Sequence, residues 1–181
     1  MMPLHKGLPG IPELSGLAVR DLTLDSREVG RKDVFIALKG AAVDGHDYID
    51  AAVKAGAVAV IAEHPVAGTE VPVVVVSDLK ARLGELAHDF YQAPSDHLQM
   101  IGITGTNGKT STCQYIAQSL DYLGKRCGII GTNGQGLWGA LQETINTTPD
   151  VVRLHRELAR QRDQGGSIFE RPDIDIGLTL R

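Results

Sequence analysis

Short apolar runs separated by polar stretches make up much of the first half of the chain. Runs of this length, rich in β-branched residues, are typical of buried strands. Strands are therefore predicted at Leu22–Leu24, Val34–Leu38, Ala57–Ala62 and Val73–Val76. A helix is predicted at Tyr48–Ala55, where Gly56 follows as a C-terminal stop. A second helix is predicted to begin after a capping Asp78, because apolar side chains recur at helical spacing at Leu79, Leu83, Leu86 and Phe90.

A second block begins after a seam near residues 92–96, where Pro94 marks a connector. Its first elements are predicted to be a strand at Met100–Thr104, a glycine-rich turn, a helix at Thr110–Leu123 and a strand at Cys127–Ile130. Strand, turn, helix and strand in this order indicate a parallel βαβ unit of a nucleotide-binding core.

A further helix is predicted toward Gln164. Thr148 would provide a capping hydroxyl, Pro149 would take the first helical position, and Asp150 would lie at the positive end of the helix dipole. The chain is thus predicted to have an α/β fold with two domains, a small one over residues 1–93 and a truncated parallel-sheet domain over 94–165. Residues 166–181 are expected to form a tail.

Composition supports a folded protein and narrows its class. The chain of 181 residues is 43% hydrophobic and 22% charged, as in ordinary globular proteins. A net charge of −4 argues against a nucleic-acid binder. The first fifteen residues lack the apolar core of a signal peptide, and no stretch approaches the length of a membrane span. Cys113 and Cys127 form neither a disulfide framework nor a metal-binding spacing, so a reducing, cytoplasmic setting is expected. The six histidines have no ligand-spaced partner and are expected to be structural or exposed.

The strongest chemical signal is the segment between the predicted strand and helix of the second block. It reads Gly105, Thr106, Asn107, Gly108, Lys109 and Thr110. Glycines allow backbone N–H groups to turn toward phosphates, and the helix N-terminus favours an anion. Lys109 can reach the β- and γ-phosphates of ATP as a catalytic cation, and the Thr110 hydroxyl can bind Mg²⁺. The usual pattern has a further glycine where this chain has Ile103, so the loop is a variant. The alternative is a glycine-rich turn with a surface lysine.

These residues resemble a known family. The string Gly105–Thr110 is similar to the phosphate loop of Mur ligases and of folylpolyglutamate synthetases, and Thr110 favours the former. Thr23–Arg27 with Asp33–Gly40 resembles the uridine-binding start of the Mur ligases that add the third and later residues of the muramoyl peptide. Asp44–Ile49 resembles the segment that follows it, and Asn146–Asp150 resembles the muramoyl-peptide-binding stretch of the ligase for the third residue.

The resemblance implies roles for particular residues. The domain over 1–93 would bind the UDP-linked substrate, and the domain over 94–165 would bind ATP and Mg²⁺. Contacts with the UDP-linked substrate would come from Leu24, Ser26, Asn146, Thr147 and Thr148. Each has an alternative: Ser26 and Arg27 could form a simple turn with a surface ion pair, Asn146 an ordinary turn, and Thr148 only a helix cap.

The implied activity is ATP-dependent amide formation. A diamino acid, with meso-diaminopimelate favoured over lysine, would be joined to UDP-N-acetylmuramoyl-L-alanyl-D-glutamate, with no obligatory protein partner. After Gly165 the sequence departs from the Glu-Val-Ser-Ser-His-like segment of the family, and Glu170 does not match its magnesium ligand. The chain is therefore expected to be an incomplete, inactive part of such an enzyme, with a tail foreign to the fold. Two alternatives are a folylpolyglutamate-synthetase-like ligase or kinase that uses only the ATP loop, and a non-catalytic UDP-sugar-binding module.

Overall fold

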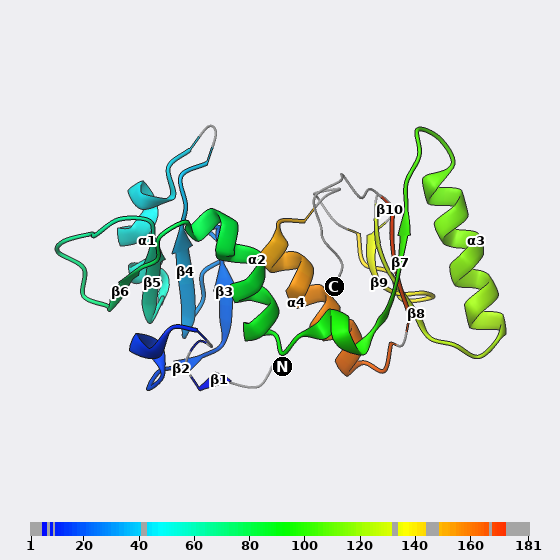
Figure 1. Ribbon diagram of the computed structural model, residues 1–181, viewed down its shortest axis with the longest axis horizontal. Coiled ribbons are helices and arrows are strands. Elements are labelled where there is room, and N and C mark those ends of the chain that lie inside the picture. The colour runs from blue at the N-terminus through cyan, green and yellow to red at the C-terminus, as the bar shows by residue number, and fades with distance from the viewer. Residues whose placement is uncertain are drawn as a thin grey trace. The chain divides into compact units, whose positions relative to one another are not determined.

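The computed structural model describes residues 5–6, 8, 10–40, 43–131, 134–143, 149–166 and 168–172. The chain divides into two compact units, which we call unit 1 (Met1–Phe90) and unit 2 (Tyr91–Arg181). Each unit contains a sheet with parallel strands and at least two helices, which confirms the predicted α/β class (Figure 1). The roles predicted for segments 1–93, 94–165 and 166–181 stay predictions.

Unit 1 is built on a four-stranded sheet in which all neighbours are parallel. In spatial order, its strands are β3 (Asp21–Thr23), β4 (Asp33–Ala37), β5 (Ala59–Ala62) and β6 (Val73–Val75). Every residue of β4 and β5 is buried, as expected for the central strands of a sheet with both faces covered. All four predicted strands are thus present, displaced by one or two residues at most at each end.

Helices and short elements complete unit 1. They are β1 (His5–Lys6) paired with β2 (Ala18–Val19), the 3-10 turns η1 (Pro12–Leu14) and η2 (Gly45–Tyr48), and the helices α1 (Ile49–Ala55) and α2 (Leu79–Phe90). Gly56 ends α1 at a φ of 115°, and its N–H donates to Ala52 O and Val53 O, as predicted. Asp78 precedes α2, but its φ of 53° differs from the extended backbone of a typical capping residue.

An ion pair connects Arg20, which precedes β3, with Asp33, the first residue of β4. The Arg20 guanidinium donates to both carboxylate oxygens of Asp33, at 2.7 and 2.6 Å. The Asp33 carboxylate is buried and also accepts from Gly30 N at 2.8 Å. A side chain at Gly30 would collide with the guanidinium. The buried charge is therefore satisfied from two directions, which fixes the start of β4.

The loop after β4 is fastened by polar contacts. Asp44 caps η2 by accepting from His46 N at 3.0 Å, and its carboxylate lies 2.7 Å from His46 Nδ1. The backbone hydrogen bond from His46, followed by the contact with its ring, lowers the pKa of Asp44 below its ordinary value. The His46 ring stacks on His64, with 4.4 Å between ring centroids. The exits of β4 and β5 are thereby held together.

Unit 2 has a mixed four-stranded sheet. In spatial order its strands are β7 (Gln99–Ile103), β10 (Ile168–Pro172), β8 (Cys127–Gly131) and β9 (Gly134–Leu137). β10 is parallel to both β7 and β8, whereas β9 is antiparallel to β8. β10 lies within the tail that was expected to be foreign to the fold. A parallel ladder uses backbone groups alone, so an extended segment can enter the slot between β7 and β8 without matching a family motif.

Two helices cover opposite faces of this sheet (Figure 1). They are α3 (Lys109–Tyr122) and α4 (Val151–Asp163), and the short η3 (Pro94–His97) precedes β7. Ile129 of β8 belongs to the apolar cluster with Cys113 and Ala117 of α3. The next residue, Ile130, belongs to the cluster with Leu154 and Leu158 of α4. This alternation along one strand is what a strand covered on both faces requires.

The start of α4 differs from the prediction. Asp150 is the capping residue, since its carboxylate accepts from Arg153 N at 2.8 Å, and the helix begins at Val151. Thr148, predicted as the cap, lies outside the described residues. An aspartate one residue before the helix provides the cap, so Pro149 precedes the helix instead of occupying its first position. Among the described residues, none of the helices is both long and apolar enough to span a membrane.

We predict that Arg20→Ala lowers the free energy of unfolding by roughly 1–3 kcal/mol, because the buried Asp33 carboxylate loses two of its three donors. Urea unfolding followed by circular dichroism measures this loss. The control is Lys54→Ala, an exposed position on α1, which should stay within about 0.5 kcal/mol of wild type. Equal stability of the two variants would contradict the role of the ion pair.

Asp44 should make stability depend on pH. Folding lowers the pKa of Asp44, so the ionised carboxylate stabilises the fold above its ordinary pKa of 3.8. That contribution is lost as the pH falls through the lower pKa of the folded state. Asp44→Asn, which keeps a capping side chain, should be less stable than wild type at pH 7 and should match it at the acid end of the titration. Unfolding free energies across this pH range test the prediction, and the same pH-dependent gap in the exposed control Asp89→Asn would contradict it.

Candidate functional site

The predicted phosphate loop is a tight turn between β7 and α3. Gly105 has a φ of 147° and Gly108 a φ of 78°, both in the region that favours glycine. A Cβ added at Gly108 would meet nothing within 4 Å, so open space lies beside the turn. Residues 104–108 are exposed, and α3 begins directly after Gly108. The turn can therefore present backbone N–H groups and the positive end of a 14-residue helix to an anion.

Lys109 and Thr110 form the first turn of α3 and are half-buried. The Lys109 ammonium donates to Gly105 O at 2.6 Å, so its charge lies over the turn. The role of Lys109 as a phosphate ligand stays a prediction. The structure brings all six predicted ATP-binding residues into one strand-to-helix connection.

Ile103 accounts for the variant form of the loop. It is the last residue of β7 and is buried in the apolar cluster that includes Cys113 and Ala117 of α3. A glycine at this position would remove a side chain from beneath the helix. The glycine-rich part of the turn thus begins after the strand, and a core side chain occupies the position that is usually glycine.

The direction of the strands sets where this turn lies in unit 2. β7, β10 and β8 run in parallel, so their carboxyl ends are at one edge of the sheet. The turn follows the carboxyl end of β7, and ligands of open α/β sheets bind at this edge.

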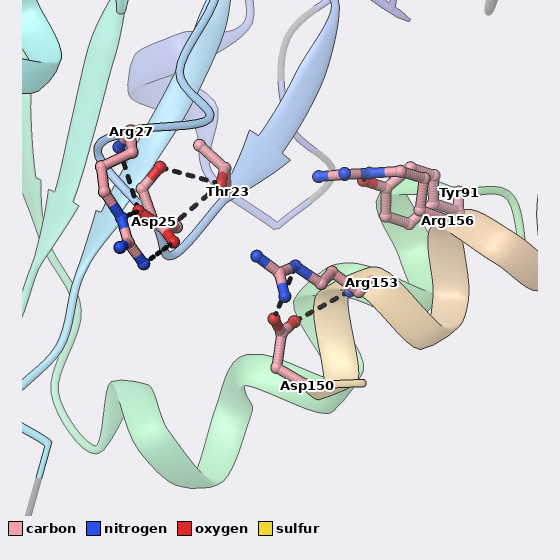
Figure 2. Close-up of polar contacts among 7 residues, drawn as sticks. All are labelled: Thr23, Asp25, Arg27, Tyr91, Asp150, Arg153 and Arg156. Atoms are coloured by element: carbon pink, nitrogen blue, oxygen red, sulfur yellow. Dashed lines mark hydrogen bonds and ion pairs between the residues drawn. The ribbon is translucent and has the colours of Figure 1, made fainter. Parts of the chain in front are cut away.

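In unit 1, the Asp25-Ser26-Arg27 turn follows the carboxyl end of β3. Figure 2 shows Asp25 between Thr23 and Arg27: Asp25 N donates to Thr23 Oγ1 at 3.2 Å, and the Asp25 carboxylate accepts from Arg27 N, Nε and Nη2. The hydrogen bond from Arg27 to Asp25, and then their charge attraction, raises the pKa of the guanidinium. The structure therefore contains the ion pair, between Arg27 and Asp25, that is expected if this segment is a simple turn. Leu24 and Ser26 are half-buried beside it, and their role as ligands stays a prediction.

Other polar groups gather at the same edge of this sheet. Lys39 N, after β4, donates to the Glu63 carboxylate, after β5, at 2.8 Å, and His64 carries the ring that stacks on His46. The sequence pattern does not single out Glu63 or His64 as site residues, because their partners are distant in the chain. The parallel order of β4 and β5 could have indicated them, because it brings the residues that follow both strands to one edge of the sheet.

The third predicted segment is described only in part. Asn146, Thr147 and Thr148 lie outside the described residues, so their proximity to the phosphate loop stays a prediction. The helix that follows begins with Asp150 capping Arg153 N, and the Arg153 guanidinium lies 3.4 Å from the same carboxylate (Figure 2). One turn later, Arg156 Nε donates to the Tyr91 hydroxyl at 3.4 Å.

Among the residues that the structure describes, no three side chains of His, Cys, Asp or Glu lie together in a way that could hold a metal ion.

Family models match successive parts of the chain. Residues 18–91 match the Mur ligase family, catalytic domain, and residues 103–169 match the Mur ligase middle domain. Together these segments span most of the sequence, and each lies mainly within one of the two units.

Individual proteins of known sequence and structure agree with these matches. The UDP-N-acetylmuramoyl-L-alanyl-D-glutamate--2,6-diaminopimelate ligase of Pseudomonas syringae pv. tomato is 48% identical over 151 residues, covering 81% of this chain and 31% of that protein. A solved structure of a ligase with the same name is 28% identical with a TM-score of 0.70, covering 86% of this chain and 32% of that one. A MurF ligase from Thermotoga maritima in complex with ADP is 26% identical with a TM-score of 0.59, covering 85% and 32%.

This chain therefore spans about a third of the length of the relatives that it matches. Their likeness nevertheless extends through both units, from the turn after β3 to the phosphate turn and α4. On the combined strength of these matches and the geometry of the strand-to-helix turn, the chain belongs to the Mur ligase family.

Proposed function

We propose that this chain provides the two nucleotide-binding parts of a ligase that joins meso-diaminopimelate to UDP-N-acetylmuramoyl-L-alanyl-D-glutamate at the expense of ATP. The observation that carries the proposal is the exposed turn at Gly105–Gly108, with Lys109 folded over it, in a chain 48% identical to a ligase named for this reaction. Substrates of this polarity suit a cytoplasmic reaction.

The phosphate turn of unit 2 fits a nucleotide triphosphate. The backbone of Gly105–Gly108 and the N-terminus of α3 would hold the phosphates, and the Lys109 ammonium would move from Gly105 O to the β- and γ-phosphate oxygens. Thr110 would contribute its hydroxyl to Mg²⁺. Support for ATP also comes from the MurF relative, whose structure holds ADP.

Bound ATP would transfer its γ-phosphoryl group to a substrate carboxylate, which gives an acyl phosphate and ADP. The amine of the diamino acid would then attack the acyl carbon and displace phosphate as the amide forms. The chain's own contribution is electrostatic: Lys109 and the dipole of α3 neutralise the negative charge that develops on the transferring group. Unit 1 contributes by positioning. Leu24, Ser26 and the edge that carries the Asp25–Arg27 pair would hold the uridine nucleotide, so that binding energy orients the distant carboxylate.

The Lys109→Ala variant should bind ATP with Mg²⁺ roughly ten- to a hundredfold more weakly, because a hydrogen bond to a charged group contributes about 1.5–3 kcal/mol. Isothermal titration calorimetry measures the change. Lys125→Ala is the matched control, since this exposed lysine lies just beyond the other end of α3. Equal ATP affinity of the Lys109 variant and wild type would contradict the role of this turn in binding ATP.

Ser26→Ala should weaken binding of UDP-N-acetylmuramoyl-L-alanyl-D-glutamate about two- to tenfold, since one neutral hydrogen bond contributes roughly 0.5–1.5 kcal/mol. Its affinity for ATP should not change. The control is Ser15→Ala, an exposed position after η1. Wild-type protein that binds ATP but not the UDP-linked peptide would favour a kinase or a folylpolyglutamate-type ligase. The reverse result would favour a UDP-sugar-binding module.

A further inference from the structure

Two histidines at the carboxyl edge of the unit 1 sheet lie face to face. His46 is on η2, in the connection after β4, and His64 follows β5. Their rings are stacked, with 4.4 Å between the centroids and 10° between the ring planes. His64 is exposed, whereas the side chain of His46 is only 14% exposed. The imidazole of His64 is thus an exposed ring that a covered ring holds in place.

The covered ring of His46 is fixed by Asp44. The carboxylate oxygen Oδ1 accepts from His46 N at 3.0 Å and lies 2.7 Å from His46 Nδ1. The backbone hydrogen bond, and then the contact with the ring, lower the pKa of Asp44, so the carboxylate is ionised at neutral pH and Nδ1 is the donor. Among the described residues, His46 Nε2 is buried without a hydrogen-bond partner. His46 therefore supports the stack but presents no polar atom to a ligand.

The charges around the two rings favour a proton on this pair. Two stacked imidazolium rings would repel each other, so the stack limits the pair to one proton. The acidic groups nearby outnumber the basic ones: Asp44 and Asp47 lie on η2 and Glu63 precedes His64, against Lys39 after β4. Arg27, after β3, is engaged by Asp25. An anion at this edge therefore gains most from the ring that can become positive and that solvent can reach, which is His64.

The stack shares its edge of the sheet with the turn after β3. Tyr48, the last residue of η2, interacts electrostatically with Arg27 of that turn. Because β4 separates β3 from β5, the carboxyl ends of these two strands are roughly 10 Å apart, which is two strand spacings. A nucleoside diphosphate has a comparable length. A nucleoside held beside Ser26 can therefore place its diphosphate near His64.

We propose that His64, stacked on His46, binds the diphosphate of the UDP-linked substrate in its protonated form. A protonated imidazole donates charge-assisted hydrogen bonds to phosphate oxygens. Histidine is also the side chain that changes its charge between about pH 5 and 8, so binding of the substrate takes up a proton. The inference rests on the proposed function for the identity of the anion, and it adds to that function a residue that makes substrate affinity depend on pH.

The test is isothermal titration calorimetry with UDP-N-acetylmuramoyl-L-alanyl-D-glutamate at pH 8 and pH 6. The diphosphate of this ligand is esterified at both ends and keeps its charge over this range, so a change in affinity reports on the protein. Wild type should bind roughly two- to fivefold more tightly at pH 6, as expected for an exposed ion pair. His64→Gln keeps a polar side chain but cannot become charged. It should match wild type at pH 8, which shows that unit 1 is folded, and should lose the gain at pH 6.

The matched control is His97→Gln, which removes an exposed histidine on η3 of unit 2 and should keep the wild-type gain. Titrations at pH 7 in two buffers of different protonation enthalpy should show proton uptake in wild type and in this control, but not in His64→Gln. A purely structural role of His64 would not change this uptake.

Two results would overturn the inference and leave the proposed function intact. One is an equal gain at pH 6 in His64→Gln and wild type. The other is a loss of affinity in His64→Gln by the same factor at both pH values, because that loss would not depend on charge. If wild type fails to bind the UDP-linked peptide at either pH, both the inference and the proposed function are wrong.

Discussion

Parallel strand pairing is the constraint on which both units depend. Parallel neighbours must be joined by a crossover, and they bring the carboxyl ends of their strands to one edge of the sheet. In unit 1 that edge carries the Asp25-Ser26-Arg27 turn together with the exits of β4 and β5. In unit 2 it carries the phosphate turn and the start of α3. Residues that are far apart in the sequence therefore meet at an edge because of strand direction.

Sequence reasoning succeeded where local chemistry decides the structure. The four strands of unit 1, the glycine that ends α1 and the strand-turn-helix at residues 99–122 all follow from apolar runs and glycine positions. The turn at Gly105–Gly108 was predictable because glycine positions and a helix start coincide within a short segment, and its role in binding phosphate stays a prediction.

Other features depend on contacts that a linear pattern does not contain. β10 lies in a segment expected to be a tail foreign to the fold, and its place is set by backbone pairing with β7 and β8. The cap of α4 was assigned to a hydroxyl when a nearer carboxylate was available at Asp150. Glu63 and His64, after β5, lie at the candidate site of unit 1 because they contact Lys39 and His46 in the connection after β4. Gln92 and Ala93 have positive φ values that their residue types do not favour, and the hydrogen bonds from Arg162 of α4 to the carbonyls of Tyr91 and Gln92 cannot be read from the sequence.

The position of β10 has a consequence for the order in which the chain folds. β7 and β8 are not direct neighbours, so the sheet of unit 2 cannot close until residues 168–172 have left the ribosome and entered between them. Unit 1 pairs strands that are adjacent in the chain, and its loops are short by comparison. Non-local pairing of this kind is slow because a long loop must close first. During synthesis, unit 1 can complete its core while β7 and one edge of β8 are still unpaired, which makes unit 2 the more aggregation-prone of the two units until β10 enters its sheet.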